Sequence, residues 1–318
     1  MICFVITWRQ KTLRKLRDIS GMPSHRIWSY DQLFRAKRLP TATWVFTDFD
    51  RLSSWELELA AHVFRALQQQ GMRVLNDPAL AVHRFPLLRR LHAAGLNRFG
   101  VWRLDELDAV DRWPVFLRTE AAHRGPLTEL IFNLSDLQRE VSRAITQGLP
   151  VCNLMIVEYC AQPLRPDFFC KLAAFRIGDR LVRTLSVHDS SWAAKYGKSD
   201  ITEEAFYQEE LDDMKCDLDD SVLHQAFEQA HLEYGRVDYT IVDGATQVYE
   251  INSNPTIGRL LEHSSPLRLK AAQISERLMV EAFQQIDAKA GKPVLVTDEL
   301  LARQRKADWF MLRSRWVI

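Results

Sequence analysis

The most constraining feature of this sequence is a pair of short apolar segments that carry polar side chains. Residues 236–242 and 247–251 are predicted strands, and the Asp-Gly turn between them is a strong hairpin signal. Because side chains alternate along a strand, Glu250 and Asn252 share one face, and the hairpin brings Asp238 beside them. The sequence therefore predicts two carboxylates and an amide oxygen at one point.

This trio of oxygen donors is suited to a hard cation, and to Mg²⁺ above all, with water and phosphate oxygens completing the coordination. Two carboxylates held together without a cation would repel each other, or one would take up a proton. We therefore predict Asp238, Glu250 and Asn252 as metal ligands. The alternative is a solvent-exposed strand face on which the acidic residues are incidental.

Residues 1–84 are predicted to form an N-terminal α/β domain. Residues 2–7, 43–47 and 72–75 are short apolar, strand-like runs. Between the last two, Ser53 is a predicted helix cap, and apolar residues follow at helical spacing as far as Gly71. The order strand, helix, strand indicates parallel pairing.

The rest of the chain is predicted to be α+β. In residues 85–185, strands are separated by single helices and a hairpin turns at Gly178-Asp179, which indicates a central insert. Residues 186–290 form the C-terminal domain, and 291–318 form a basic, aromatic tail. Residues 203–220, which hold nine acidic residues and one lysine, are interpreted as a solvated face.

Composition excludes several classes of protein. The 318 residues include 42 Lys+Arg and 41 Asp+Glu, so neither a disordered chain nor a globally basic nucleic-acid binder is expected. Only 12 glycines are present, which counts against functions that need several glycine-rich loops. No GxSxG, HExxH or GxxxxGK[ST] string occurs, so serine hydrolase, zincin and P-loop chemistry have no support.

The cysteines and the ends predict a cytoplasmic protein. Five cysteines without CxxC spacing indicate buried free thiols, not a disulfide framework or a structural zinc site. No run of 18 apolar residues is present, so no membrane span is expected, and the apolar run at the N-terminus is too short for a signal peptide.

Five motifs in order resemble the ATP-grasp superfamily over roughly residues 72–285. They are Asn76-Asp77 followed by Arg84 and its helix, the strand 113–118 ending at Arg118, the hinge-like strand 155–159, the hairpin 169–182, and Asp238 with Glu250-Ile251-Asn252-Ser253-Asn254-Pro255. The set is similar to that of ribosomal-protein glutamate ligases. More loosely, it resembles an uncharacterised ATP-grasp group with FLR…HxGP and EINxNP strings.

The resemblance implies that ATP lies between two antiparallel sheets, one from the insert and one from the C-terminal domain. It implies adenine contacts, mainly from the backbone, at Glu158, Tyr159 and Cys160, and a ribose contact at Asp167. Arg84 and Arg118 would hold phosphates, and His123 and Arg124 would supply side-chain donors from the following loop. The cations Arg118, Lys171 and Arg236 would act in catalysis, Lys171 also contacting the cofactor.

Several positions depart from the family pattern. Arginine stands at 84 and 118 where lysine is usual, which keeps the charge and adds a bidentate fork. Residues 119–126 contain one glycine, so an ordinary polar turn is the alternative to a phosphate-binding loop. Ala173 falls where many members bind the acyl phosphate with arginine, leaving Lys171 and Arg176 as the available cations. The segment with His188, Asp189, Trp192 and Lys195 is a candidate substrate or lid loop.

The implied activity is an ATP- and Mg²⁺-dependent carboxylate–amine ligase that forms an acyl phosphate and releases ADP and phosphate. A kinase for a small-molecule hydroxyl and a non-catalytic ATP-binding module remain alternatives. The expected partners are small-molecule or peptide carboxylates and amines, with no nucleic acid or membrane, and a homodimer is left open. The basic residues between 9 and 38 are interpreted as a solvated face.

Overall fold

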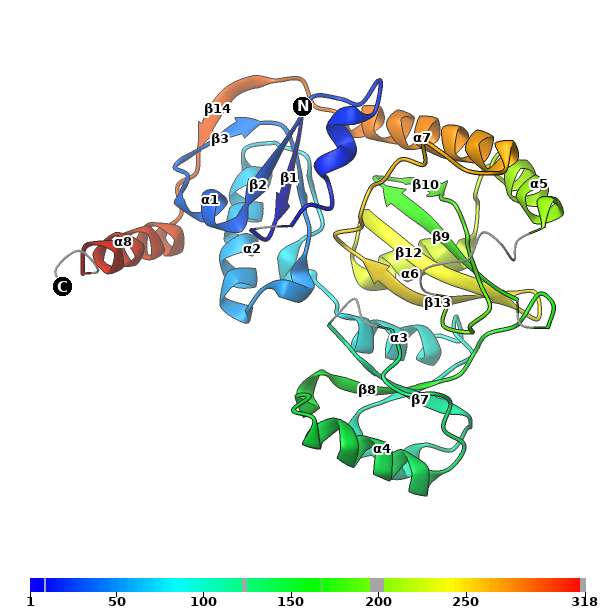
Figure 1. Cartoon of the computed structure of the whole chain (residues 1–318). Coiled ribbons are helices and arrows are strands. Elements are labelled where there is room, and N and C mark those ends of the chain that lie inside the picture. Colours follow the sequence, from blue (N-terminus) through cyan, green and yellow to red (C-terminus); the bar gives the residue numbers. More distant parts are fainter. Residues whose placement is uncertain (9, 122–124, 167, 195–202, 315–318) are drawn as a thin grey trace.

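The computed structural model describes residues 1–8, 10–121, 125–166, 168–194 and 203–314, with side chains as far as residue 307. Three units are visible in Figure 1: an N-terminal sheet with its helices, a small lower unit, and a larger sheet crossed by a long helix. Among the described helices, none combines the length and the apolar character needed to cross a bilayer.

The N-terminal unit is built on a parallel sheet, as predicted. Its strand order is β2-β1-β4-β5, with β1 Ile2–Ile6, β2 His25–Ser29, β4 Thr43–Phe46 and β5 Val74–Leu75. Helix α2 (Ser54–Gln69) begins at a capping box in which Ser53 and Glu56 each satisfy the other's backbone N–H. Strand β2 was not predicted, because this half-exposed edge strand lacks clear alternation. Helix α1 (Tyr30–Arg35), which has six residues, was not predicted either.

The lower unit is a three-stranded antiparallel sheet in the order β6-β8-β7. The strands are β6 Val101–Trp102, β7 Val115–Thr119 and β8 Leu154–Glu158. Helix α4 (Leu134–Thr146) covers one face, where Leu137 and Val141 pack with Val115 and Leu117. The other face, which carries Phe116 and Arg118, is turned toward the C-terminal sheet. Helix α3 (Arg84–Ala93) lies between the two units (Figure 1).

The C-terminal sheet has the order β10-β9-β12-β13, and β11 adds to β9. Its strands are β9 Phe169–Ile177, β10 Arg180–Arg183, β11 Val187–Asp189, β12 Tyr234–Val242 and β13 Ala245–Asn252. The helices of this unit are α5 Glu204–Asp213, α6 Ser221–Ala230 and α7 Pro266–Ile286. The domain boundary predicted after residue 185 therefore falls between two strands of one sheet.

The C-terminal segment, predicted only as a tail, folds back on the N-terminal unit. Strand β14 (Gly291–Leu295) pairs with β3 (Arg38–Thr41), and α8 (Glu299–Ser314) packs beside α1 and α2. The Nδ1 atom of His62 on α2 lies 2.7 Å from the Asp298 carboxylate at the start of α8. Five short 3₁₀ helices complete the described elements: η1 Arg14–Asp18, η2 Phe49–Arg51, η3 Pro78–Leu80, η4 Leu104–Ala109 and η5 Val151–Asn153.

All five cysteines are free thiols. Cys3 is buried in β1, but Cys152 and Cys216 are exposed, so the expectation of buried thiols is wrong for these two.

A buried asparagine joins the N-terminal sheet to the C-terminal sheet. The amide nitrogen of Asn76 donates to the carbonyls of Phe46 (2.9 Å) and Tyr234 (2.8 Å). Its amide oxygen accepts from the backbone N–H groups of Glu233 and Tyr234. Asn76 has no exposed surface, and its φ of 63° lies in the left-handed region that asparagine tolerates better than most residues. This one side chain therefore fixes where β12 begins.

Tyr234 itself is expected to be replaceable without loss of stability. Its ring packs with Phe4 and Phe283 in a core that joins α7 to both sheets, but its buried hydroxyl has no hydrogen-bond partner among the described residues. Because an unsatisfied buried hydroxyl costs about 1–3 kcal/mol, Tyr234→Phe should leave the free energy of unfolding unchanged or raise it by about 1 kcal/mol. Urea denaturation measures this.

The matched control is Tyr30→Phe. The Tyr30 hydroxyl is also buried but donates to the Thr47 carbonyl at 2.6 Å, so its removal should destabilise the protein by about 1 kcal/mol. If both variants lose the same stability, the Tyr234 hydroxyl is satisfied in solution.

Candidate functional site

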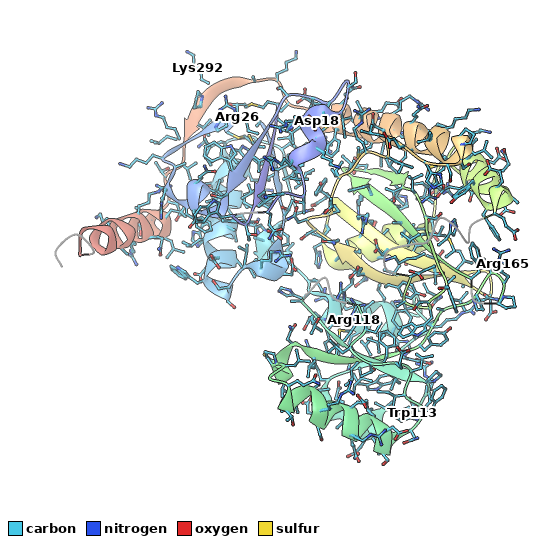
Figure 2. All side chains as sticks on the ribbon, viewed as in Figure 1. Asp18, Arg26, Trp113, Arg118, Arg165 and Lys292 are labelled. Carbon is cyan, nitrogen blue, oxygen red and sulfur yellow. The ribbon has the colours of Figure 1, made fainter. Side chains whose placement is uncertain are left out.

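The predicted site residues that the structure describes line one cavity between the two antiparallel sheets. Its volume is about 270 Å³. Figure 2 shows Arg118 at the junction of the lower unit and the C-terminal sheet. Ten residues singled out from the sequence line this cavity: Arg84, Arg118, Glu158, Tyr159, Cys160, Lys171, Arg236, Asp238, Glu250 and Asn252.

The hairpin of β12 and β13 places the predicted metal ligands as expected. Asp238 is paired in register with Glu250, and Arg236 with Asn252. Arg236 and Asp238 are two residues apart, so alternation puts all four side chains on the sheet face that lines the cavity. The side-by-side arrangement of Asp238 and Glu250 is thus a consequence of strand register.

Each carboxylate of this pair is neutralised by two cations. Asp238 accepts from Arg236 Nε at 3.0 Å, and its other oxygen lies 3.1 Å from Lys171 Nζ. Glu250 forms an ion pair with Arg84, and Arg118 Nη2 lies 3.7 Å from the same carboxylate oxygen. The four cations come from α3, from β7 of the lower unit, and from β9 and β12 of the C-terminal sheet. The helix and both sheets must therefore be folded before the cluster exists.

Burial and charge act in opposite directions on these groups. Burial alone would raise the pKa of Asp238, but the charges of Arg236 and Lys171 bring it below its ordinary value, so the group stays ionised. Burial lowers the pKa of Arg84 to about 10, against the opposing effect of nearby acids. Burial and the neighbouring charge of Arg84 lower the pKa of Arg118 to about 9. Both guanidinium groups therefore remain protonated at neutral pH.

Two buried guanidinium nitrogens of the cluster, Arg84 Nε and Arg118 Nε, have no hydrogen-bond partner among the described residues. The Glu250 oxygen Oε2 has only the two guanidinium groups as partners there. Buried donors without acceptors are costly, and a phosphate would supply the missing acceptors to both guanidinium groups. A hard cation could then replace the two guanidinium groups at the Glu250 carboxylate. The arrangement therefore fits an anionic phosphate ligand together with a divalent cation.

The cavity also has an aromatic part. Trp192 packs against Phe116 with ring centroids 4.8 Å apart and against Tyr159 at 5.7 Å, while Phe99 packs against Tyr249 at 6.1 Å. Trp192, weighed in the sequence as a loop residue that could line a site, does so. An aromatic part beside a charged part matches the two halves of a nucleotide.

Phe99, Phe116 and Tyr249 were missed from the sequence. Phe116 could have been found, because it lies two residues before Arg118 on β7 and therefore shares its face. Tyr249 could not. Asp238 pairs with Glu250 but Tyr239 with Val248, so Tyr249 is the extra residue of a β-bulge. A bulge re-aims a side chain, which is why Tyr249 and Glu250, although adjacent, both line the cavity.

The hinge is held by the protein's own hydrogen bonds. The N–H of Glu158 donates to Gly100 and that of Tyr159 to Pro114, and the Cys160 carbonyl accepts from the Tyr249 hydroxyl at 2.6 Å. The Glu158 carboxylate accepts from Gly100 N and pairs with Arg112. Glu158, Tyr159 and Cys160 line the cavity, but the backbone groups just named already have partners within the protein. The predicted backbone contacts to adenine are therefore limited to the other backbone groups of these residues.

The other candidates either fall outside the described residues or do not line the cavity. His123, Arg124, Asp167 and Lys195 fall outside the described residues, although Gly125 and Pro126 of the same loop line the cavity. Arg176 bonds to the Gly178 carbonyl and lies over the Phe227 ring, so it does not supply the cation missing at Ala173. His188 and Asp189 are buried and do not line the cavity; His188 packs against Phe168.

Comparison with solved structures identifies the fold. The ATP-grasp ligase PsnB, complexed with a phosphomimetic variant of a minimal precursor, Mg and ADP, superposes with a TM-score of 0.52 over 89% of this chain and 97% of that chain, at 11% identity. The chain has the ATP-grasp fold. The predicted resemblance and fold class are thereby confirmed, while so low an identity shows the architecture alone.

Two further ATP-grasp structures are similar over comparable lengths. D-alanine–D-alanine ligase from Bacillus anthracis gives a TM-score of 0.49 at 12% identity, covering 97% of this chain and 99% of that one. A RimK domain protein from Sphaerobacter thermophilus DSM 20745 gives 0.47 at 14% identity, covering 89% and 99%. No protein-family model matches the sequence, and no curated protein matches it significantly. The chemistry of this ATP-grasp chain must therefore be argued from its own residues.

Proposed function

We propose that this ATP-grasp protein is an ATP- and Mg²⁺-dependent ligase. It activates a carboxylate as an acyl phosphate, which an amine attacks to form an amide, and it releases ADP and phosphate. The observation that carries the proposal is the single cavity with an aromatic part, four convergent cations and two carboxylates paired in register. The presence of Mg and ADP in the PsnB structure supports the same choice of cofactors.

The base of ATP would occupy the aromatic part, between Trp192 and the hinge at Tyr159 and Cys160. Arg84 and Arg118 would transfer from Glu250 to the phosphates, where each guanidinium finds the acceptor that its Nε lacks. Fixed positive charges in a water-poor site stabilise the negative charge that develops during phosphoryl transfer. Arginine side chains would thus bind the phosphates here, a role that glycine-lined loops have in other nucleotide-binding proteins. His123 and Asp167 lie outside the described residues, and their contacts to ATP are part of the proposal.

Asp238, Glu250 and Asn252 would hold Mg²⁺. When bound, Mg²⁺ neutralises phosphate charge and orients the transferring group. The Glu250 carboxylate becomes available as Arg84 and Arg118 move to the phosphates, so nucleotide and metal are expected to support each other's binding. An amide oxygen from Asn252 and phosphate oxygens would complete the coordination that the two carboxylates begin.

Lys171 is the feature that favours the ligase over a kinase on the same fold. Ala173 is paired with Asp238 in register, and Lys171 lies two residues along β9, hence on the same face. Its ammonium group is 3.1 Å from Asp238. A cation is therefore available close to where the acyl-phosphate arginine of other members would be. Arg236, the second cation on Asp238, would stabilise charge on the reacting carbonyl.

Product analysis tests this function. Purified protein is incubated with ATP, Mg²⁺ and a panel of amino acids and short peptides, and ADP, phosphate and adduct mass are measured. The ligase predicts ADP and free phosphate in equal amounts, with an adduct that has lost one water. A phosphorylated product without free phosphate would support the kinase, and ATP binding without turnover on any acceptor would support the non-catalytic module.

Arg118→Met is expected to weaken ATP binding roughly tenfold or more, because a hydrogen bond to a charged group contributes about 1.5–3 kcal/mol. Isothermal titration calorimetry measures the dissociation constant. Arg139→Met on the exposed face of α4 removes the same charge far from the cavity and should leave binding unchanged. Equal affinity of the Arg118 variant and the parent protein would remove Arg118 from the phosphate site.

A further inference from the structure

A second, smaller cavity adjoins the charged part of the proposed ATP site. Its volume is about 60 Å³, enough for a few waters or the head of a small substrate. It shares Arg84 and Asn252 with the larger cavity. Its other walls come from η2 of the N-terminal unit, from the start of α3 and from the end of β13. A group bound here would therefore lie beside the phosphates.

Asp50 is held in the wall of this cavity by a rigid turn. Asp48, two residues before Asp50, is fully buried and has a φ of 67°, in the left-handed region. Its carboxylate accepts from the Thr7 backbone N–H at 2.9 Å and from Arg51 Nε at 2.9 Å. Its own N–H donates to the Ser253 hydroxyl at 3.1 Å, which ties the turn to the loop after β13. The position of Asp50 relative to Asn252 is thus fixed by the fold.

Asp50 is the acidic wall residue that forms no ion pair with any described residue. Glu120, the other carboxylate in this cavity, pairs with Arg103 at 2.5 Å and accepts from the Phe85 N–H at 3.1 Å. In the part of the chain that the structure describes, no cation lies within ion-pair distance of Asp50. Its negative charge is nevertheless close enough to Arg84 to favour the protonated form of that guanidinium.

We propose that this cavity is the amine subsite and that Asp50 binds the ammonium group of the acceptor. The inference rests on the proposed ligase function and deepens it. A half-buried carboxylate that pairs with no described residue is suited to an ammonium ion, with which it forms a charge-assisted hydrogen bond. The substrate class is a primary amine with a small, unhindered head, and the small cavity excludes bulky substituents at the nitrogen.

The position also suits the chemistry of the second step. The ammonium loses one proton to His83, whose imidazole lines the same cavity and is a chemically suitable general base. The free amine then attacks the acyl carbon. A carbon–nitrogen bond forms, the carbon–oxygen bond to the phosphoryl group breaks, and phosphate leaves with the bonding electrons. The second proton of the nitrogen leaves with the phosphate.

Two nucleophiles separate this inference from the proposed function. Hydroxylamine is uncharged near neutral pH and traps acyl phosphates as hydroxamates, so it reports carboxylate activation without an ammonium site. A primary amine from the product panel reports the complete reaction. Asp50→Asn should raise the KM for the amine about tenfold or more, with hydroxamate formation and the KM for ATP within twofold of the parent protein. Asp50→Glu, which keeps the charge, should recover part of the loss.

The matched control is Glu58→Gln, an exposed acid on α2 of the same unit, which should change neither reaction. Equal losses with hydroxylamine and with the amine would show that Asp50 acts on activation and would overturn the inference. An unchanged KM for the amine in Asp50→Asn would overturn it as well. Absence of hydroxamate with every acid in the parent protein would overturn the proposed function, and the amine subsite with it.

Discussion

Glu250→Gln is expected to lower ATP-dependent turnover roughly 10³-fold, with little change in backbone structure. The substitution keeps the size of the side chain but removes one of two carboxylates at the proposed Mg²⁺ site, and losing electrostatic stabilisation at a phosphoryl-transfer centre typically costs this much. Coupled assays of ADP release, run across a range of Mg²⁺ concentrations, measure the effect. Glu228→Gln, an exposed acid on α6, is the matched control.

The same substitution should change stability in a way that depends on nucleotide. In the structure Glu250 neutralises two buried guanidinium groups, and removing one partner of a buried pair commonly costs about 3–5 kcal/mol. ATP should restore part of this loss by taking the place of the carboxylate beside Arg84 and Arg118. Full turnover in Glu250→Gln would refute the metal site, and thermal unfolding insensitive to ATP would refute the proposed exchange of partners.

Asn76→Ala is expected to lower the free energy of unfolding by roughly 4 kcal/mol or more. Four buried backbone groups would lose their partner, at about 1 kcal/mol or more each, and alanine is strained at the positive φ of this position. Single domains are stable by about 5–15 kcal/mol, so folding at elevated temperature should be lost. Urea denaturation measures the change.

Two companion variants separate the causes. Asn76→Gly relieves the backbone strain but not the lost hydrogen bonds, so it should be about 1 kcal/mol less destabilising than Asn76→Ala. Asn97→Ala removes a buried amide whose partner among the described residues is the Val248 backbone, and it should cost about half as much. If Asn76→Ala is no worse than Asn97→Ala, the connection between the two sheets does not depend on Asn76.

Much of the charged part of the site could be predicted from the sequence because it depends on local periodicity. Strand alternation and a hairpin turn suffice to bring Asp238 beside Glu250 and Asn252, and the structure places them in that register. The parallel N-terminal sheet followed in the same way from the order of strands and a capped helix. Patterns of this kind survive in a single sequence because each involves neighbours along the chain.

The remaining features arise from contacts between distant segments. The pairing of Lys171 with Asp238 and of Arg84 with Glu250 joins different units, and no periodicity predicts which acid each cation will meet. The bulge at Tyr249 breaks the alternation on which such predictions depend.

The sequence alone therefore determined the kind of chemistry, through an oxygen-rich hairpin and a supply of arginines in a glycine-poor chain. Only the tertiary structure decided the charge balance of the cluster, the aromatic part of the cavity and the position of the Asp50 carboxylate beside it. The physical reason is that burial and electrostatic pairing are properties of the assembled chain. A side chain's desolvation, and the charge that compensates it, are fixed only when elements far apart in sequence pack together.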